Sequence, residues 1–412
     1  MVKCNNGSAT RMWNKDFILL VQGQGVSCLG STLYSVVASL WVYELTGSTV
    51  IMSTVYAASN IARLIAFPFA GIIVDRFRRR DLIVFCDAMC GISMLAVALI
   101  AFHGSQTAVW ALVIYSAVSG VCSGVFSPSV NTLMISIAGS KHYVRANSVF
   151  STVEYGIDIL GQAIAGTLYL LLGAPVLFLV NGISYLFSSA TEVFISKDAK
   201  PVRKEREPFI KEATEGVRFI VKNRGVCANL FLAFSINFAF GILKVVLVPW
   251  MLTFGEECYG LLESFKSSGV IIGTVLLAAR NLPEKKRHSV YFWCQIIFGS
   301  CIAISTQMRN FWVIAILFCV AYANQYVFNS LQRSAVFISA PDEIRGKVIC
   351  AVQALAMGFS AIGNLAGGFV CEVIDPQPLV FGLMILLLME IVLIARQREV
   401  RTLFCVNQAP VE

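Results

Sequence analysis

The 412-residue chain is 57% hydrophobic and 14% charged, and its mean hydropathy is +0.74. A water-soluble domain carries roughly 25% charged residues, so the composition excludes a soluble globule and indicates a membrane protein. The formal net charge of +8 would be compatible with binding to nucleic acid. The distribution of the basic residues instead reflects the topology of a membrane protein, so no nucleic-acid partner is expected.

Apolar stretches of about 20 residues, the length that crosses a bilayer, recur along the whole chain. The predicted fold class is therefore all-α, a polytopic membrane protein with about twelve transmembrane helices. The expected spans lie near 17–43, 49–72, 82–102, 108–127, 147–172, 176–195, 226–252, 261–279, 290–307, 311–331, 348–372 and 378–395.

The basic residues gather between alternate spans. If both termini are cytoplasmic, most of the 32 Lys and Arg residues fall in inner segments, above all in the polar run from Lys197 to Arg224. Only Lys266 and Arg309 fall near outer loops, and Arg63 and Lys244 lie inside spans. This asymmetry predicts an even number of spans, a multi-pass protein of the inner (plasma) membrane, and two cytoplasmic termini.

The residues that bind metals and cofactors form no recognisable site. The thirteen cysteines are scattered through apolar stretches without C-x-x-C pairs, and the three histidines lie far apart. We therefore expect neither a metal nor a cofactor, and we expect the cysteines to be small buried side chains. A phosphate-binding loop and the motif of a serine hydrolase are also missing from the sequence, so an enzyme is not expected.

Two segments about 200 residues apart share one plan. Arg145-Ala146-Asn147 leads to the small-residue stretch 161–166, and Arg345-Gly346-Lys347 leads to the small-residue stretch 363–368. Internal duplication of a helical membrane bundle is typical of transporters that move one half against the other around a central site. We therefore predict two pseudo-symmetric six-helix bundles.

The longest polar stretch divides the chain between these halves. We predict four parts: an N-terminal bundle (1–196), a cytoplasmic linker with an amphipathic helix on the membrane surface (197–224), a C-terminal bundle (225–397) and a cytoplasmic tail (398–412). Glycines at four-residue spacing, such as Gly120 and Gly124 or Gly363 and Gly367, predict closely packed helices.

The loop after the second span has a characteristic motif. It reads Gly71-Ile72-Ile73-Val74-Asp75-Arg76-Phe77-Arg78-Arg79-Arg80 and resembles the signature loop of the major facilitator superfamily, G-x-L-x-D-R-x-G-R-R/K. Arg78 stands where that family usually has Gly. The resemblance implies a gate at the cytoplasmic end, formed by Gly71, Asp75, Arg76, Arg79, Arg80 and Arg345.

Further residues resemble one branch of this superfamily. Ser127-Pro128, Arg145-Ala146-Asn147 and Arg345-Gly346-Lys347-Val348 are similar to elements of macrolide-efflux proteins and enterobactin-type siderophore exporters. The resemblance implies a proton-coupled antiporter that exports drugs or siderophores and can confer antibiotic resistance. We expect the protein to be a monomer. The chain departs from the usual proton-coupling pattern, because it has Ser116 where many exporters have Arg and Gly161-Gln162 where they have Gly-Pro.

Charged residues within the spans are candidates for that coupling, because ionisable groups in a bilayer mark pathways and proton relays. Arg63, Glu154 and Asp158 fall near mid-depth, and Lys244 falls in the outer half of the seventh span. We expect Glu154 and Asp158 to bind the coupling proton, with Arg63 or Lys244 as an electrostatic partner. The alternative is a structural ion pair, such as Arg63 with Asp158. We expect Asp87 to reach the lipid headgroups and Glu192 to be a helix-end residue.

Amide and aromatic residues on the spans that surround the path in this superfamily are candidates for a substrate cavity. They are Gln24, Tyr34, Phe234, Asn237, Phe238, Asn324, Gln325 and Asn329. An aromatic cavity with a few amides suits an amphipathic organic molecule, so the predicted function is secondary active export of such small molecules. Uptake, lipid transport and, from another class, a membrane-embedded enzyme acting on lipid remain alternatives.

Overall fold

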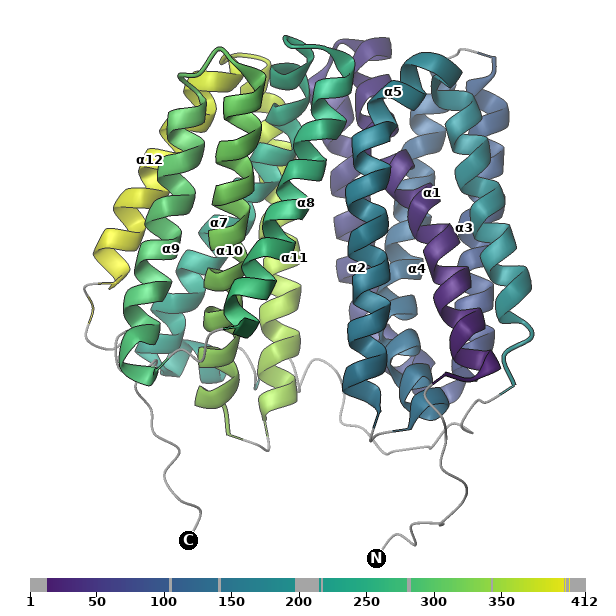
Figure 1. Ribbon diagram of the computed structural model, residues 1–412, viewed down its shortest axis with the longest axis horizontal. Coiled ribbons are helices and arrows are strands. Elements are labelled where there is room, and N and C mark those ends of the chain that lie inside the picture. Colours follow the sequence, from purple (N-terminus) through teal and green to yellow (C-terminus); the bar gives the residue numbers. More distant parts are fainter. Residues whose placement is uncertain are drawn as a thin grey trace, which may run out of the picture.

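The computed structural model describes residues 13–103, 106–139, 142–196, 215, 218–279, 283–341, 344–395, 397 and 400. Over this part of the chain the regular elements are all α-helices, as predicted (Figure 1). The helices are α1 (Lys15–Thr46), α2 (Thr49–Arg76), α3 (Arg79–Ala101), α4 (Thr107–Ala138), α5 (Tyr143–Glu192), α7 (Arg224–Leu252), α8 (Glu256–Ala279), α9 (Glu284–Ser305), α10 (Phe311–Ser339), α11 (Arg345–Cys371) and α12 (Pro376–Ala395).

Helix α5 consists of two membrane-spanning segments. Gly173 interrupts it with a φ of 75°, and Pro175 follows within the next turn. Glycine adopts positive φ without strain, and proline is well placed in the first turn of a new helix. The described residues contain eleven helices of sufficient length and apolarity to span a membrane. With α5 counted twice they supply twelve spans, in agreement with the sequence prediction.

Local capping explains the tight connection between α1 and α2. The Asn14 side chain accepts a hydrogen bond from the Phe17 N–H at 2.9 Å, which starts α1. Gly47 ends the helix in the left-handed conformation, at φ 64°, and the Ser48 hydroxyl then accepts the Ile51 N–H at 3.3 Å. Because the 32 residues of α1 cross the molecule before Gly47, Ser48 and Thr49 lie at the end opposite to the start of α1.

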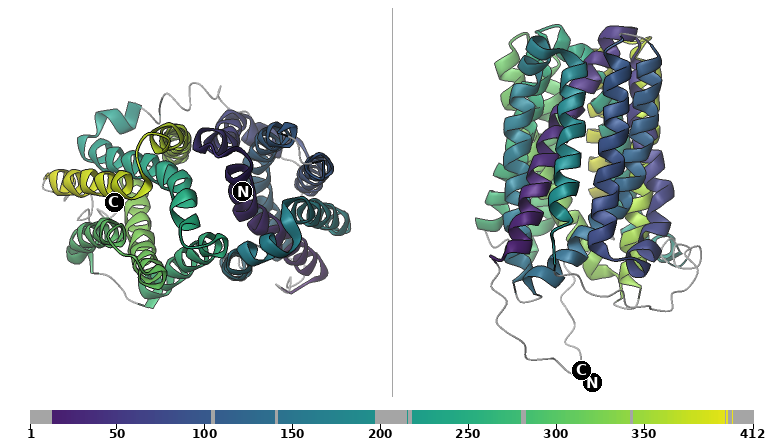
Figure 2. Two further views of the ribbon diagram at one scale, coloured as in Figure 1. Left: turned by 90° about the horizontal axis from the view of Figure 1, so that it is seen from above. Right: turned by 90° about the vertical axis from the view of Figure 1, so that its right-hand side faces the viewer.

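The helices form two groups that stand side by side, α1 to α5 and α7 to α12 (Figures 1 and 2). Helix α1 packs on α5, α2 on α4, and α3 on both α4 and α5. In the second group α7 packs on α11, α8 on α10, and α9 on both α10 and α12. The same pairing therefore recurs six spans later, as expected for two halves related by pseudo-symmetry.

Glycines mark the closest approaches between neighbouring helices. A Cβ atom on Gly120 would collide with the backbone of Ser59, and one on Gly363 would collide with the backbone of Phe238. Side chains at these positions would push the helices apart, because small residues allow membrane helices to approach closely. The packing predicted from the glycine spacing is confirmed at both positions.

Most of the predicted linker and tail lie outside the described residues. This applies to 197–214, 216–217 and, apart from Val400, to the tail. At the end of the linker, Ile220 is buried in the core of the second bundle. Glu215 forms an ion pair with Lys347 at the start of α11, with 2.6 Å between Oε2 and Nζ. The last turn before α7 is thus attached to the C-terminal group of helices.

Candidate transport site

Two seams join the helix groups at the end of the molecule where α1 meets α2. In the first seam, between α2 and α11, the Thr49 hydroxyl donates to the Gly368 carbonyl at 2.7 Å. The Ser48 hydroxyl donates to Glu372 at 2.6 Å beside it. A Cβ atom on Gly368 would collide with Ser53. Small residues of the second repeated stretch, 363–368, thus permit this contact.

The second seam, between α5 and α8, uses the first repeated stretch, 161–166. Ser267 donates a hydrogen bond to the Gln162 side chain at 2.8 Å. Gly166 lies so close to Glu257 that a Cβ atom would collide with its backbone. The two stretches recognised as a repeat in the sequence therefore occupy equivalent positions, because each lies at one of the two seams. Toward the other end of the molecule the ribbons of the two groups separate (Figure 1).

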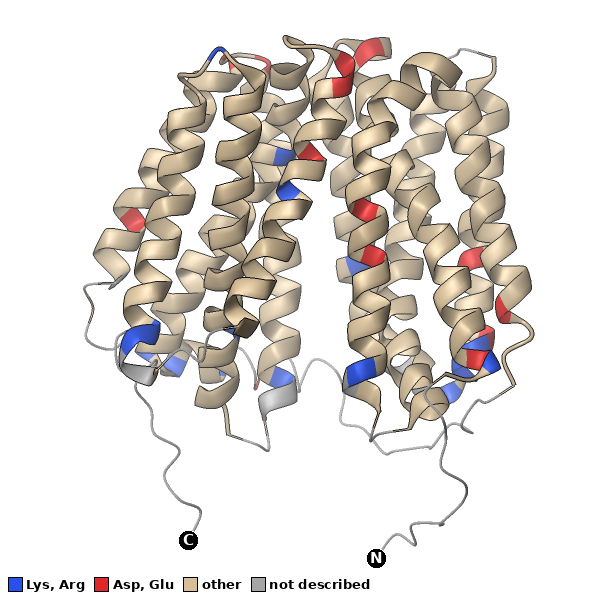
Figure 3. Cartoon of the chain, in the orientation of Figure 1, with Lys and Arg blue, Asp and Glu red and all other residues tan. Residues whose placement is uncertain are grey.

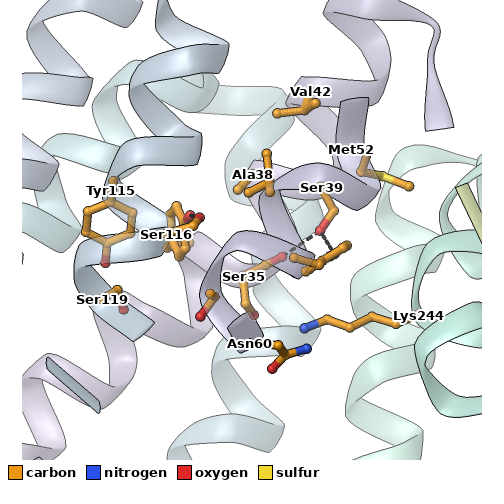
Figure 4. A pocket seen from close by; sticks show the side chains of 14 residues that line it. Ser35, Ala38, Ser39, Val42, Met52, Asn60, Tyr115, Ser116, Ser119 and Lys244 are labelled. Carbon is orange, nitrogen blue, oxygen red and sulfur yellow. Dashed lines mark hydrogen bonds between the residues drawn. The ribbon is translucent and has the colours of Figure 1, made fainter. Parts of the chain in front are cut away.

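Below the seams, a polar pocket of about 130 Å³ lies between the groups. Helices α1, α2 and α4 supply most of its wall, and Lys244 reaches in from α7 (Figure 4). Its Nζ lies 4.0 Å from the centre of the Tyr56 ring on α2, in a cation–π contact. Tyr34, predicted to line the substrate cavity, belongs to this wall. Its hydroxyl lies 3.3 Å from the Ser116 hydroxyl.

A second lysine in this region corrects the sequence prediction. Lys266 was expected near an outer loop, but it is only 9% exposed and forms an ion pair with Glu263 at 2.5 Å. Its Nζ also lies 4.9 Å from the centre of the Tyr322 ring. The prediction was wrong because α8 begins at Glu256 rather than near residue 261. Lys266 is therefore about 15 Å along the helix.

Two acids of α5, Glu154 and Asp158, are half-buried. Asp158 accepts a hydrogen bond from the Thr32 hydroxyl of α1 at 2.5 Å, and the Cys28 thiol lies 3.8 Å from the same oxygen. Within the described residues, neither Asp158 nor Glu154 forms an ion pair with Arg63 or Lys244. The Arg63 Nε is buried without a hydrogen bond there. The expected electrostatic partners are thus not in contact with the acids in this conformation.

A larger, mainly apolar cavity of about 370 Å³ lies in the C-terminal group, between α7, α10 and α11. Phe234, Asn237 and Asn329, three of the predicted cavity residues, line it. The Phe234 ring stacks on Phe359 with 5.1 Å between centroids and 1° between planes. Phe240, on the same wall, precedes Lys244 by one helical turn, so the cavity approaches the polar pocket along α7.

The remaining predicted cavity residues take other positions. Gln325 is buried and donates to Asn329 at 3.2 Å, which orients that amide. Asn324 donates to the Val320 carbonyl of its own helix at 2.8 Å, and Phe238 lies where α7 meets Gly363 of α11. Gln24 lines a separate cavity of about 180 Å³ inside the N-terminal group.

That third cavity contains an acid that the sequence analysis misplaced. Asp87 was expected to reach the headgroups, but it is 3% exposed and lines the cavity on α3. Glu192 does end α5, yet its side chain is fully buried and accepts a hydrogen bond from Ser188 at 3.4 Å. Each carboxylate has one oxygen without a hydrogen bond in the described structure. Burial by neighbouring helices, which hydropathy does not reveal, explains the error.

The residues of the gate motif lie at the end opposite the seams. Arg76 ends α2 and is exposed, whereas Arg79 is buried. Arg80 donates to the Ile195 carbonyl at 3.2 Å and pairs with Asp81 at 2.9 Å. It therefore binds the carbonyl groups beyond the end of α5. The surroundings of Gly71 and the side chains of Asp75 and Arg345 lie outside the described part.

Comparisons with known proteins agree with this architecture. Residues 20–283 match the Major Facilitator Superfamily. The chain is 21% identical to macrolide efflux protein A of Streptococcus pyogenes, over 69% of this chain and 70% of that protein. It is 26% identical to a putative bacilysin exporter of Bacillus amyloliquefaciens, over 84% of this chain and 86% of that protein.

Among solved structures, a mutant of the nucleoside transporter NupG superposes with a TM-score of 0.77 at 13% identity, covering 92% of this chain and all of that one. This likeness concerns the fold alone. The family match extends over more than half of the chain and agrees with the repeated helix pairing and the twelve spans. The chain belongs to the major facilitator superfamily and is a secondary transporter rather than an enzyme.

Proposed function

We propose that this protein is a proton-coupled exporter of hydrophobic and amphipathic small molecules that works by alternating access. The observation that carries the proposal is the apolar, aromatic cavity between α7, α10 and α11, whose wall residue Phe240 lies one helical turn before Lys244. Its volume of about 370 Å³ lies within the range typical of small-molecule sites. Similarity to efflux proteins supports export.

Charge supports an orientation with both termini in the cytoplasm. Lys and Arg residues gather at the end where α1 begins, opposite the seams (Figure 3). Positive residues favour the cytoplasmic side of a membrane. With this orientation in the plasma membrane, the seams close the outer end and the apolar cavity lies toward the cytoplasm. An exporter loads its substrate from that side.

The acids of α5 supply a route for coupling. Glu154 and Asp158 lie one turn apart, and carboxylates at such depth serve as proton sites in many transporters. The residue after Asp158, Ile159, accepts a hydrogen bond from Ser264 of α8 at 2.8 Å across the seam. A change of charge at Asp158 therefore occurs one residue from a contact that must break when the outer end opens.

In the opposite conformation the outer end would be open and the cytoplasmic end closed. Opening of the two seams would then bring the gate motif, with Arg76, Arg79 and Arg80, toward the start of α11. Asp75 and Arg345 are the oppositely charged residues proposed to meet there. The cargo would leave through the outer end, and the protonated acids would return the protein to the loading conformation.

The proposal is tested in inside-out membrane vesicles, in which an exporter appears as an accumulator. We expect saturable, uncoupler-sensitive uptake of at least one of four probes: erythromycin, ethidium, a catecholate siderophore or lysophosphatidylcholine. Vesicles without this chain are the control. Accumulation only in right-side-out vesicles would indicate an uptake permease, and accumulation of none of the probes under a pH gradient would contradict the proposal.

A further inference from the structure

Lys244 has no ion-pair partner within the described residues. No carboxylate of this part of the chain lies at ion-pair distance from its Nζ, which lies 4.0 Å from the centre of the Tyr56 ring. Glu263 of α8 pairs instead with Lys266 at 2.5 Å. The Lys244 side chain is nevertheless accessible, because it projects into the pocket between the helix groups (Figure 4). A charge at this depth is retained when it faces a cavity or a partner.

The surroundings of Lys244 are rich in hydrogen-bond donors. Hydroxyl and amide groups of the N-terminal half line the pocket into which it reaches, among them Ser119 and Asn60 (Figure 4). The Tyr34 hydroxyl belongs to the same wall. The residues that line this pocket include no Asp or Glu. A lysine surrounded by neutral donors, with no acid on the wall, is suited to an oxyanion, which accepts charge-assisted and neutral hydrogen bonds at once.

The space next to Lys244 can accommodate the hydrophobic part of a bound molecule. Phe240 precedes Lys244 by one turn of α7, and it is part of the wall of the large apolar cavity. The Phe240 ring also lies 5.8 Å from the ring of Tyr322. A molecule with its charged group at Lys244 can therefore place its hydrophobic part along α7, between Phe240 and Phe234.

We infer that Lys244 binds the anionic group of the transported molecule, and that the cargo is an amphipathic organic anion, with a carboxylate or phosphate head. This inference rests on the proposed export function and names its substrate class. The oxyanion replaces the face of Tyr56 as the counterpart of the lysine. Because Lys244 belongs to one bundle and the donors to the other, the bound anion bridges the two halves.

Binding to the purified full chain in nanodiscs tests the inference. The probes are 11-(dansylamino)undecanoic acid and its neutral methyl ester, followed by dansyl fluorescence. We expect Lys244→Gln to raise the Kd of the acid by about tenfold or more and to leave that of the ester within about twofold. Lys244→Arg, which keeps the charge, should remain within about threefold of the unaltered protein. Lys286→Gln, at an exposed lysine near the start of α9, is the matched control.

Competition in the unaltered protein gives a test that does not depend on a variant's folding. Decyl phosphate and decanoate should displace the acid probe, and decyltrimethylammonium should not; the ranking of the two anions distinguishes a phosphate from a carboxylate site. Equal losses of acid and ester in Lys244→Gln, displacement by the cation, or no binding of the acid would each overturn the inference. If vesicles still accumulate ethidium or erythromycin in that case, the export proposal stands and only the anionic substrate class falls.

Discussion

Ser264 of α8 donates its hydroxyl hydrogen to the backbone carbonyl of Ile159 in α5, 2.8 Å away. This bond joins the two bundles directly beside Asp158, which itself accepts the Thr32 hydroxyl of α1. The proposed proton site and the α5–α8 seam are therefore separated by a single peptide unit. Substitutions at either place lead to the different expected effects given below.

Asp158→Asn should abolish proton-driven accumulation of the substrate and preserve the exchange of labelled for unlabelled substrate. The amide keeps the size of the side chain and its place beside Thr32, but it cannot bind and release a proton. We expect at least about a hundredfold loss of uncoupler-sensitive uptake in inside-out vesicles, the lower end of what a positioned proton-transfer group contributes. Counterflow of labelled against unlabelled substrate, which needs no proton gradient, should continue. Proton flux at the unaltered level in this variant would exclude Asp158 from coupling.

Gly166→Ala should open the α5–α8 seam. The added methyl group would collide with the backbone at Glu257, and overpacking of this kind costs about 1–3 kcal/mol. We expect slower transport and greater reactivity of Cys258, at the start of α8, toward a membrane-impermeant maleimide applied from outside.

Gly156→Ala is the matched control for this substitution. Gly156 lies on the same helix, and a Cβ atom there meets nothing within 4 Å. It should leave transport and labelling unchanged, with a small gain in stability because alanine favours the helix more than glycine does. Equal effects of the two substitutions would show that helix propensity, and not contact across the seam, is responsible.

Glu263→Gln should destabilise the protein, because it leaves the Lys266 ammonium buried without its carboxylate. Removal of one partner of a buried ion pair costs about 3–5 kcal/mol, whereas replacement of both is often neutral. We expect a clear fall in Tm for the purified protein and recovery of most of it in the double variant Glu263→Gln with Lys266→Met. A double variant no more stable than the single one would show that the pair itself, and not the orphaned charge, matters.

Asp87→Asn should leave the protein at least as stable as before. The carboxylate is 3% exposed, and one of its oxygens lacks a hydrogen bond within the described structure. An amide avoids the cost of burying a charge for which the described part of the chain supplies no cation partner. Thermal unfolding measures the effect, and Asp81→Asn, at an exposed acid that pairs with Arg80, is the comparison. A marked loss of stability would mean that the Asp87 carboxylate holds its neighbouring helices together.

The sequence by itself determined the class of the protein, the number of spans and the existence of two similar halves. These properties depend on local quantities. Hydropathy reports whether about 20 residues can cross a bilayer, and small residues at four-residue spacing report close helix contact. The repeated stretches 161–166 and 363–368 were recognisable for the same reason, and each was found at a seam between the halves.

Only the tertiary structure decided which charges meet and which face a cavity. Lys244 and Tyr56 lie on different halves and approach to 4.0 Å because the two bundles face each other. Lys266 is buried and paired because α8 begins earlier than predicted, which places the residue deeper in the membrane. Asp87 is enclosed by helices that are distant in sequence. A span's hydropathy is an average over all its faces, so it cannot tell a side chain that faces lipid from one that faces another helix.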